Sequence, residues 1–134
     1  MLFRSIGDQY WTLTTYNETN LYTFDNDSLD GFNKLFGLVF RTEKEAKAEL
    51  KRLKNVAEIR QWIEQQNKTW KPNFKKCTER KYYLLYDEKE KRIKYSYCLY
   101  KSARAQWKLI RSQRKADGII KKFSKERLIE FIEA

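Results

Sequence analysis

The feature that most constrains this chain is a long amphipathic helix, which the sequence predicts from residue 43 to about residue 66. Thr42 and Glu45 have the spacing of a capping box, in which each side chain accepts a hydrogen bond from the other's backbone N–H. Apolar residues then recur every three or four positions, which is the period of one helix face. These apolar residues are Ala46, Leu50, Leu53, Val56, Ala57, Ile59, Trp62 and Ile63. We therefore expect the rest of the chain to pack against this helix.

Two segments before the helix have the composition of β-strands. Residues 10–16 and 21–24 are rich in aromatic and β-branched side chains, which favour strands. Residues 17–20 between them include two asparagines, which suit a turn. The sequence therefore predicts a hairpin over residues 10–24.

The link between this hairpin and the helix is less regular. A polar loop opens at residue 25, and residues 29–37 predict either a short turn of helix or a folded loop. Gly37 permits a bend, and the apolar run at residues 38–40 predicts a third short strand over residues 38–41.

The second half of the chain repeats this order of elements. After a connector at residues 67–79, two aromatic-rich segments predict strands over 82–86 and 92–100. Ser102 is a plausible N-cap for a helix over residues 102–116, which Asp117 and Gly118 would end. Ser124 then predicts a cap for a final short helix.

The predicted fold class is therefore α+β, with a mainly antiparallel sheet packed on two longer helices. We expect one domain over residues 1–134, because a chain of this length is typical of a single domain. The halves 8–66 and 80–134 each run from hairpin to helix, so an internal repeat of a ββα-type unit is a hypothesis. The side chains predicted to be buried include Leu50, Leu53, Trp107 and Ile110.

Charge is the composition feature that bears most on function. The formal net charge is +11, yet residues 1–40 hold two basic and five acidic residues, so the excess lies in residues 41–134. A positive field of this size attracts polyanions, whether nucleic acid or an acidic protein face. No apolar run reaches the ~18 residues of a membrane span, and the N-terminus is too polar for a signal peptide, so we expect a cytoplasmic protein without membrane partners.

The sequence has no catalytic signature. It contains no histidine, which removes the commonest general base and zinc ligand. Cys77 and Cys98 do not form a CxxC pattern, and we interpret them as ordinary small apolar residues, although a disulfide between them is an alternative. Three carboxylates, which we call the acidic cluster, could hold a cation, but a polar loop is the better interpretation; they are Asp25, Asp27 and Asp30. We therefore expect no enzyme activity, no cofactor and no metal.

One stretch resembles a set of small proteins carried by phages and prophages of bacteria. The resemblance rests on a Tyr-rich strand, an Asp/Asn-rich loop, a Gly-x-Val-Phe-Arg-Thr-x-x-x-Ala motif and a Lys-rich helix. The motif residues here are Gly37, Val39, Phe40, Arg41, Thr42 and Ala46. The resemblance implies an origin in a mobile genetic element and carries over no catalytic residue.

The strongest functional signal is a run of cations in the predicted second helix. Five of them are spaced three and four residues apart, so they would share one helix face, and a sixth would continue it. These residues are Lys101, Arg104, Lys108, Arg111, Lys115 and Lys122. A further group of cations lies among the tyrosines of the second hairpin and consists of Arg80, Lys81, Arg92 and Lys94. Exposed aromatic rings beside cations can stack on bases, although alternate tyrosines in a hairpin are more often half-buried.

These signals predict a non-catalytic protein that binds nucleic acid or a nucleoprotein through the basic helix face. The alternative is a protein-binding inhibitor of a host nucleic-acid-targeting defence enzyme, of the anti-CRISPR or anti-restriction kind. A direct polyanion binder loses affinity steeply with salt, whereas an inhibitor forms a stoichiometric complex anchored by aromatic or arginine side chains.

Overall fold

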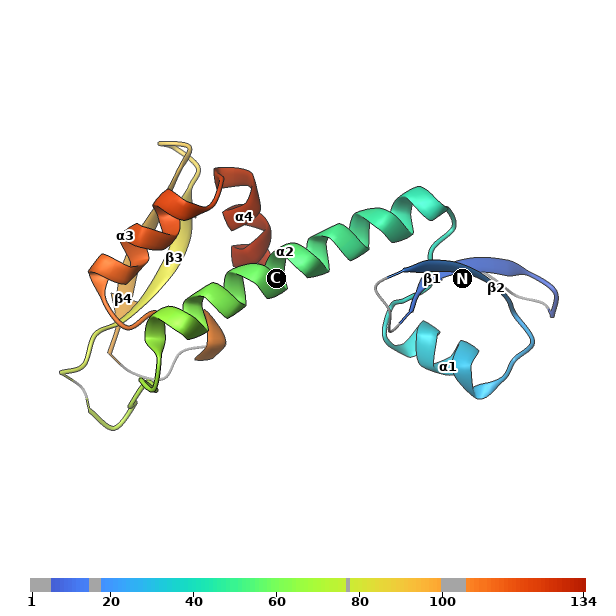
Figure 1. Cartoon of the computed structure of the whole chain (residues 1–134), viewed down its shortest axis with the longest axis horizontal. Coiled ribbons are helices and arrows are strands. Elements are labelled where there is room, and N and C mark those ends of the chain that lie inside the picture. The colour runs from blue at the N-terminus through green and yellow to red at the C-terminus, as the bar shows by residue number, and fades with distance from the viewer. Residues whose placement is uncertain (1–5, 15–17, 77, 100–105) are drawn as a thin grey trace. The chain divides into compact units, whose positions relative to one another are not determined.

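The structure, a computed structural model, describes residues 6–14, 18–76, 78–99 and 106–134 (Figure 1). Within these residues the chain forms four α-helices and two antiparallel hairpins, which confirms the predicted α+β class. It divides into two compact units, Met1–Lys54 (unit 1) and Asn55–Ala134 (unit 2), and the boundary falls inside the longest helix. We describe each unit by itself.

Unit 1 is built on the predicted first hairpin. Strands β1 (Gln9–Leu13) and β2 (Thr19–Thr23) pair antiparallel, with Tyr10 opposite Tyr22. The third strand expected at residues 38–41 is reduced to a single bridge, in which Trp11 and Phe40 exchange backbone hydrogen bonds of 2.9 Å. The pairing goes no further because the chain turns into the next helix directly after this bridge.

The sequence left a short helix and a folded loop as alternatives for residues 29–37. The structure has a helix there, α1 (Ser28–Leu35). The side chain of Asp27 accepts from the Asp30 N–H at 2.8 Å and forms a capping box with it. At the other end Gly37 has a φ of +67°, and the Leu38 N–H donates to the Asn33 carbonyl at 2.7 Å. This arrangement is a Schellman motif, whose left-handed residue is most often glycine.

Helix α2 (Glu43–Asn67) confirms the long helix. The Glu45 N–H donates to the Thr42 hydroxyl at 3.2 Å, while the Glu45 carboxylate accepts from the N–H of Arg41 rather than Thr42. The predicted apolar stripe is only partly buried. Leu53 is 41% exposed, so its predicted burial is wrong, and Leu50 is only half-buried. The physical reason is that α2 crosses the boundary between the two units, and Leu53 lies beside that boundary, outside the core cluster of unit 2.

Unit 2 contains the second hairpin, in which β3 (Lys81–Asp87) pairs antiparallel with β4 (Arg92–Cys98). Among the described residues the two hairpins form separate two-stranded sheets, so the single sheet expected from the sequence is wrong. The free edge of β3 is instead bridged by Ile110, which exchanges backbone hydrogen bonds of 2.8 and 3.0 Å with Tyr82. Cys98 donates its thiol to the Lys81 carbonyl at 3.6 Å, and Cys77 lies outside the described residues.

The helix predicted over residues 102–116 is wrong over residues 106–112, and only its last four residues are in a helix among those that the structure describes. The chain forms a 3₁₀-helix, η1 (Gln106–Lys108), and then an extended bridge at Ile110, before α3 (Gln113–Lys122) begins. The N-cap is Ser112, whose hydroxyl accepts from the Lys115 N–H at 3.3 Å. The helix continues through Gly118. A glycine inside a helix costs only ~1 kcal/mol of stability, and burial of Ile119 in the next position contributes more than that.

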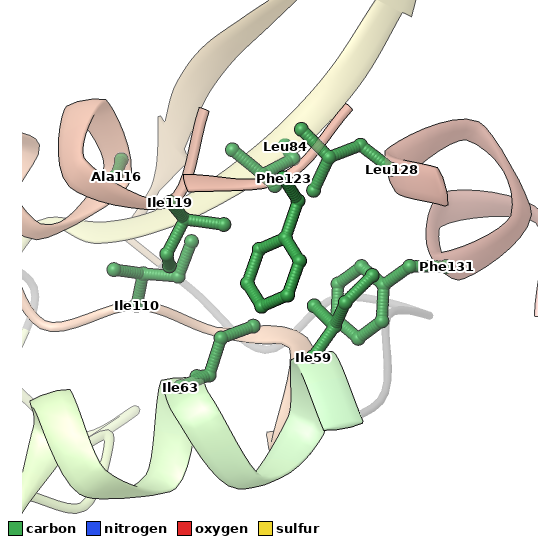
Figure 2. Packing of buried hydrophobic residues seen from close by; sticks show 9 residues of the cluster. All are labelled: Ile59, Ile63, Leu84, Ile110, Ala116, Ile119, Phe123, Leu128 and Phe131. Atoms are coloured by element: carbon green, nitrogen blue, oxygen red, sulfur yellow. The ribbon is translucent and has the colours of Figure 1, made fainter. Parts of the chain in front are cut away.

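Helix α4 (Lys125–Glu133) confirms the final short helix and its Ser124 cap. Together with α3, the hairpin and the C-terminal part of α2 it encloses the core of unit 2, which Figure 2 shows from close by. Ile59 and Ile63 of α2 point toward Phe123 there. The full cluster is Ile59, Ile63, Leu84, Ile110, Ala116, Ile119, Phe123, Leu128 and Phe131. Ile110 is fully buried as predicted, and Trp107 is half-buried against the cluster.

Two further expectations from the sequence concern membrane spans and the internal repeat. In the described ranges, no helix is both long enough and apolar enough to cross a membrane. Each unit holds an antiparallel hairpin, but the proposed internal repeat stays a prediction.

Candidate nucleic-acid interface

Of the basic residues predicted to share one helix face, the four that the structure describes do not lie on one helix. Lys101 and Arg104 lie outside the described residues. Of the others, Lys108 is in η1, Arg111 precedes the α3 cap, and Lys115 and Lys122 lie at opposite ends of α3. The single stripe fails because the helix begins ten residues later than the sequence indicated, at Ser112 instead of Ser102.

Lys108 has a structural role at the end of unit 2. Its Nζ donates to the Ile132 carbonyl at 3.2 Å and to the Ala134 carbonyl, beyond the last turn of α4. A cation at this place complements the free carbonyls of a helix C-terminus. Burial lowers the pKa of Lys108 below its ordinary value, so this ammonium is partly withdrawn from solvent.

The next three cations connect α3 to α2. The Lys115 Nζ donates to the Gln66 side chain at 3.1 Å, and the Arg111 backbone N–H donates to the Asn67 side chain at 2.9 Å. The Lys122 Nζ lies 4.6 Å from the centre of the Trp62 ring, in a cation–π contact. Lys115 is half-buried, whereas the side chains of Arg111 and Lys122 are exposed.

The cations of the second hairpin are mostly occupied within the fold. Lys81 is fully buried, and its Nζ donates to the Glu79 and Leu99 carbonyls at 2.9 and 3.0 Å, so it is not available to a partner. Lys94 is paired with Asp87 at 2.8 Å.

The other two hairpin cations are exposed. Arg92 is paired with Glu90, which also pairs with Lys94. The Arg80 guanidinium lies 4.6 Å from the centre of the Tyr97 ring. Tyr97 is 45% exposed, whereas the other described tyrosines of the hairpin are half-buried, as the conservative interpretation expected.

The structure brings together a different basic surface, which the sequence analysis missed in part. Arg114, Gly118 and Lys121 are four and three residues apart on α3 and all are exposed, while Ala116 and Ile119 on the opposite side are buried. Three more exposed cations flank this stripe along the chain. We call the set the α3 basic face; it consists of Arg111, Arg114, Lys121, Lys122 and Lys125.

The members of the α3 basic face have few charged neighbours. In the part of the chain that the structure describes, none of the five is in an ion pair with a carboxylate. The Lys125 Nζ donates to the Lys91 carbonyl at 3.3 Å, which brings the tip of the hairpin, with its own exposed lysine, beside this face. Arg114 and Lys121 could have been found from the sequence by counting from Ser112, because the buried residues then fall on the opposite side.

The two units differ sharply in charge. Unit 1 holds eight basic and eight acidic residues, whereas unit 2 holds 21 basic and 10 acidic residues. The whole formal excess of +11 therefore belongs to unit 2. The net positive charge that attracts a polyanion therefore lies in unit 2, whereas unit 1 has no net formal charge.

The acidic cluster of unit 1 is explained by the cap of α1. Its carboxylate oxygens lie within 4.8 Å of one another. Asp30 is buried and accepts from the Tyr10 hydroxyl at 2.6 Å, from the Asp25 N–H at 3.0 Å and from the Asp27 N–H at 3.2 Å. Asn33, also buried, donates to the Tyr10 hydroxyl at 3.0 Å. These carboxylates thus have partners within unit 1, although Asp30 lies buried inside α1 and not in the polar loop that the sequence favoured.

The same hydrogen bonds set the acidity of the network. Burial alone would raise the pKa of Asp30, but the hydrogen bonds from Tyr10 and from two backbone N–H groups outweigh it and lower this pKa to about 2. The hydrogen-bonded carboxylate of Asp30 raises the pKa of Asp25 instead. Burial, together with the contact to Asp30, raises the pKa of Tyr10 to about 12.

Because Asp30 and Asn33 face the interior of unit 1, α1 presents its apolar residues outward. Four large side chains of this helix and its C-cap are between 46% and 79% exposed. We call them the α1 apolar face; they are Leu29, Phe32, Leu35 and Phe36. The rings of Phe32 and Phe36 lie 4.6 Å apart and form a single apolar surface. Exposed apolar surface of this kind is typical of protein interaction sites.

Two open hollows lie among the described residues of unit 2. One, of about 750 Å³, lies between β3 and the end of α4, where Tyr83, Tyr86 and Lys108 are among its walls. The other, of about 520 Å³, lies at the C-terminal end of α2, where Trp70 and Trp107 line it together with several cations. Volumes of this order accommodate small molecules or single nucleotides.

Comparison with known proteins gives no relative of this chain. No protein-family model matches it, and no curated protein or solved structure is significantly similar to it.

Proposed function

We propose that this chain is a non-catalytic accessory protein of the phage type, which acts in the cytoplasm of a bacterial host and binds nucleic acid or a nucleoprotein through unit 2. The observation that carries the proposal is the α3 basic face, five exposed cations without a carboxylate partner among the described residues. Cations held in this way repel one another, and phosphate groups would relieve that repulsion.

The arrangement of α3 favours a phosphate backbone as the ligand. Ala116 and Ile119 fix one side of the helix in the core, so Arg114 and Lys121 are presented on the other side with a constant spacing. Gly118 lies between them, and a Cβ atom added there would meet no heavy atom within 4 Å. The absence of a side chain lets a sugar–phosphate backbone approach the helix closely.

The test removes three charges from the α3 basic face. We would replace Arg111, Arg114 and Lys121 with Gln, because these side chains are exposed and have no hydrogen bond to another described residue. Binding to a labelled duplex would be measured by fluorescence anisotropy between about 50 and 200 mM salt. Each phosphate contact contributes about −0.9 to the slope of log K against log salt, so the slope should fall in magnitude by up to about 3.

A matched control keeps the same change in net charge but places it in unit 1. Lys44, Lys51 and Lys54 are exposed on α2 and have no ion pair within the described ranges, so their replacement with Gln is the comparison. The control variant should bind like the parent with the same salt slope. If the two triple variants bind equally well, the α3 basic face is only a solvated surface and the proposal is wrong.

A second candidate function is favoured by unit 1. The α1 apolar face would suit a protein partner, in line with an inhibitor of a host nucleic-acid-targeting enzyme. Asp25 and Asp27 are exposed just before this helix, so the complementary partner would have an apolar groove edged by basic side chains, as nucleic-acid enzymes have around their channels.

This candidate has its own test. Phe32 and Leu35 would be replaced with Ser, and inhibition of a purified host defence nuclease would be compared with that of the parent and of the α3 triple variant. An inhibitor should lose potency with the first variant and keep it with the second. Equal potency of the Ser variant and the parent would exclude the α1 apolar face as the inhibitory surface. If the Ser variant instead sediments differently from the parent in the absence of a partner, this face mediates self-association.

A further inference from the structure

We infer that the hollow at the C-terminal end of α2 binds an unstacked nucleobase together with its phosphate, which makes single-stranded nucleic acid the preferred ligand of unit 2. This inference rests on the proposed function and specifies its ligand. The hollow has a volume of about 520 Å³ and is lined by two tryptophans, a proline and three cations. These residues are Trp70, Trp107, Pro72, Arg60, Lys68 and Lys71, and Asn67 and the acidic residue Glu64 complete the lining.

Two hydrogen bonds shape this hollow from the segment before α3. The Asn67 amide donates to the Leu109 carbonyl at 2.9 Å, and its oxygen accepts from the Arg111 N–H at 2.9 Å. Asn67 is the last residue of α2, so it holds the end of that helix against the chain that carries Trp107. The wall is therefore fixed by residues far apart in the sequence, which is typical of a preformed site.

The two tryptophans have different roles. Trp107 is fixed, because its ring packs edge-on against Phe131 at 5.5 Å and the Arg60 guanidinium lies 5.2 Å from its centre. Trp70 is half-buried, and its indole makes no ring contact or hydrogen bond with another described residue. Its ring is therefore free to stack on a base, the contact by which proteins bind single strands irrespective of sequence.

The cations give the hollow its preference for phosphate. Lys68 and Lys71 are exposed and, in the ranges that the structure covers, have no ion pair, whereas Arg60 is paired with Glu64 at 3.1 Å. Lys68 has a φ of +54°, since it follows the last residue of α2 in the left-handed region. The carbonyl end of a helix disfavours an anion on its axis, so the phosphate should lie on the connector side, between these two lysines.

The geometry distinguishes single strands from duplexes. In a duplex the bases are stacked on one another, so an indole inside a hollow reaches them only after unstacking. A single strand offers its bases without that cost. The α3 basic face, by contrast, contacts only the backbone and should accept either form.

The test compares Trp70→Ala with the parent on an oligothymidylate and on a duplex of the same length. Stacking on one aromatic ring corresponds to roughly a 5- to 150-fold change in affinity. The variant should lose this factor on the single strand and keep its duplex affinity, and Trp70→Phe should restore part of the loss. The Arg111, Arg114 and Lys121 triple variant should weaken binding of both ligands, so the two proposals fail separately.

A second measurement identifies the ligand chemistry. Thymidine monophosphate should quench the tryptophan fluorescence of the parent, and it should quench a smaller fraction of the fluorescence of Trp70→Ala. Inorganic phosphate should leave the fluorescence of both proteins unchanged. Amide hydrogen exchange of unit 2 would show that the variant is folded. Unchanged single-strand affinity of a folded Trp70→Ala variant, or quenching by inorganic phosphate alone, would overturn the inference.

Discussion

The buried Tyr10–Asp30–Asn33 network allows a quantitative test of the structure of unit 1. Tyr10→Phe removes one hydroxyl and leaves the ring in place, so no large cavity forms. The hydroxyl donates to a buried carboxylate at 2.6 Å and accepts from a buried amide at 3.0 Å. Hydrogen bonds to charged groups contribute about 1.5–3 kcal/mol, and both partners stay buried when this one is lost. We therefore expect unit 1 to lose roughly 2–3 kcal/mol of stability.

Amide hydrogen exchange is the suitable assay because it reports each unit separately. Trp11 and Phe40 form the backbone bridge of unit 1, and Tyr82 and Ile110 form that of unit 2. In the Tyr10→Phe variant the free energy of exchange should fall at the first pair and stay unchanged at the second.

A control variant tests whether the hydroxyl itself matters. Tyr22 lies opposite Tyr10 and has no side-chain hydrogen bond to another described residue, so Tyr22→Phe should change stability by less than about 0.5 kcal/mol. A loss below about half a kcal/mol in Tyr10→Phe, or equal losses in both variants, would refute the network.

The pH dependence of unit 1 follows from the same network. The pKa of Asp30 is lowered from 3.8 to about 2, so its contribution is complete above pH 4 and is lost as the pH falls toward 2. The pKa of Tyr10 is raised from 10.0 to about 12, so its contribution is complete below pH 10 and is lost as the pH rises toward 12. In Tyr10→Phe the alkaline loss should disappear, and the acid loss should become smaller, because the folded-state pKa of Asp30 moves back toward its ordinary value.

Three further outcomes are expected. Ile59→Ala should cost roughly 2–5 kcal/mol in chemical denaturation because it opens a cavity in the core of unit 2, whereas Leu53→Ala should cost less than about 1 kcal/mol; equal losses would mean that the two cores are assigned wrongly. Gly118→Ala should raise the thermal stability of unit 2 by about 0.5–1 kcal/mol and weaken duplex binding, and stronger binding would contradict a close backbone approach. Replacing Cys77 and Cys98 with Ser, or adding a chelator, should leave binding unchanged in an anisotropy titration, and a loss on chelation would point to a cation at the acidic cluster.

The sequence was most informative where local chemistry decides the structure. The Thr42 and Ser124 caps, the first hairpin and α2 all follow from turn residues, caps and periodicity within a few positions of one another. These signals do not depend on distant parts of the chain. They were therefore sufficient to predict the α+β class.

Long-range contacts decided the elements that were predicted wrongly. Ser102 and Ser112 are equally suitable caps by composition, but the backbone pairing of Ile110 with Tyr82 prevents a continuous helix from running through residue 110. Lys81 looks like a surface cation in the sequence, but it is buried because three carbonyls and the Glu79 carboxylate surround its ammonium. The sequence thus predicted a basic surface near this helix. The residues that form it differ from those predicted, because the helix begins at a different serine.

The outward orientation of the apolar side of α1 could not be predicted from periodicity either. The pattern of Leu29, Phe32, Leu35 and Phe36 predicts an amphipathic helix, and the usual inference places such a face in the core. Here the buried partner of the hairpin is the polar side, since Asp30 and Asn33 form hydrogen bonds with Tyr10. A periodic pattern identifies the two sides of a helix without stating which of them is buried.

The central claim is that unit 2 binds nucleic acid through the α3 basic face. The most direct measurement is a titration of the ¹⁵N-labelled protein with a short duplex, followed by amide chemical shifts. Our account predicts that the largest shifts fall at residues 111–125 and that α1 is unaffected. Shifts concentrated on α1, or no shifts at saturating duplex and low salt, would contradict it.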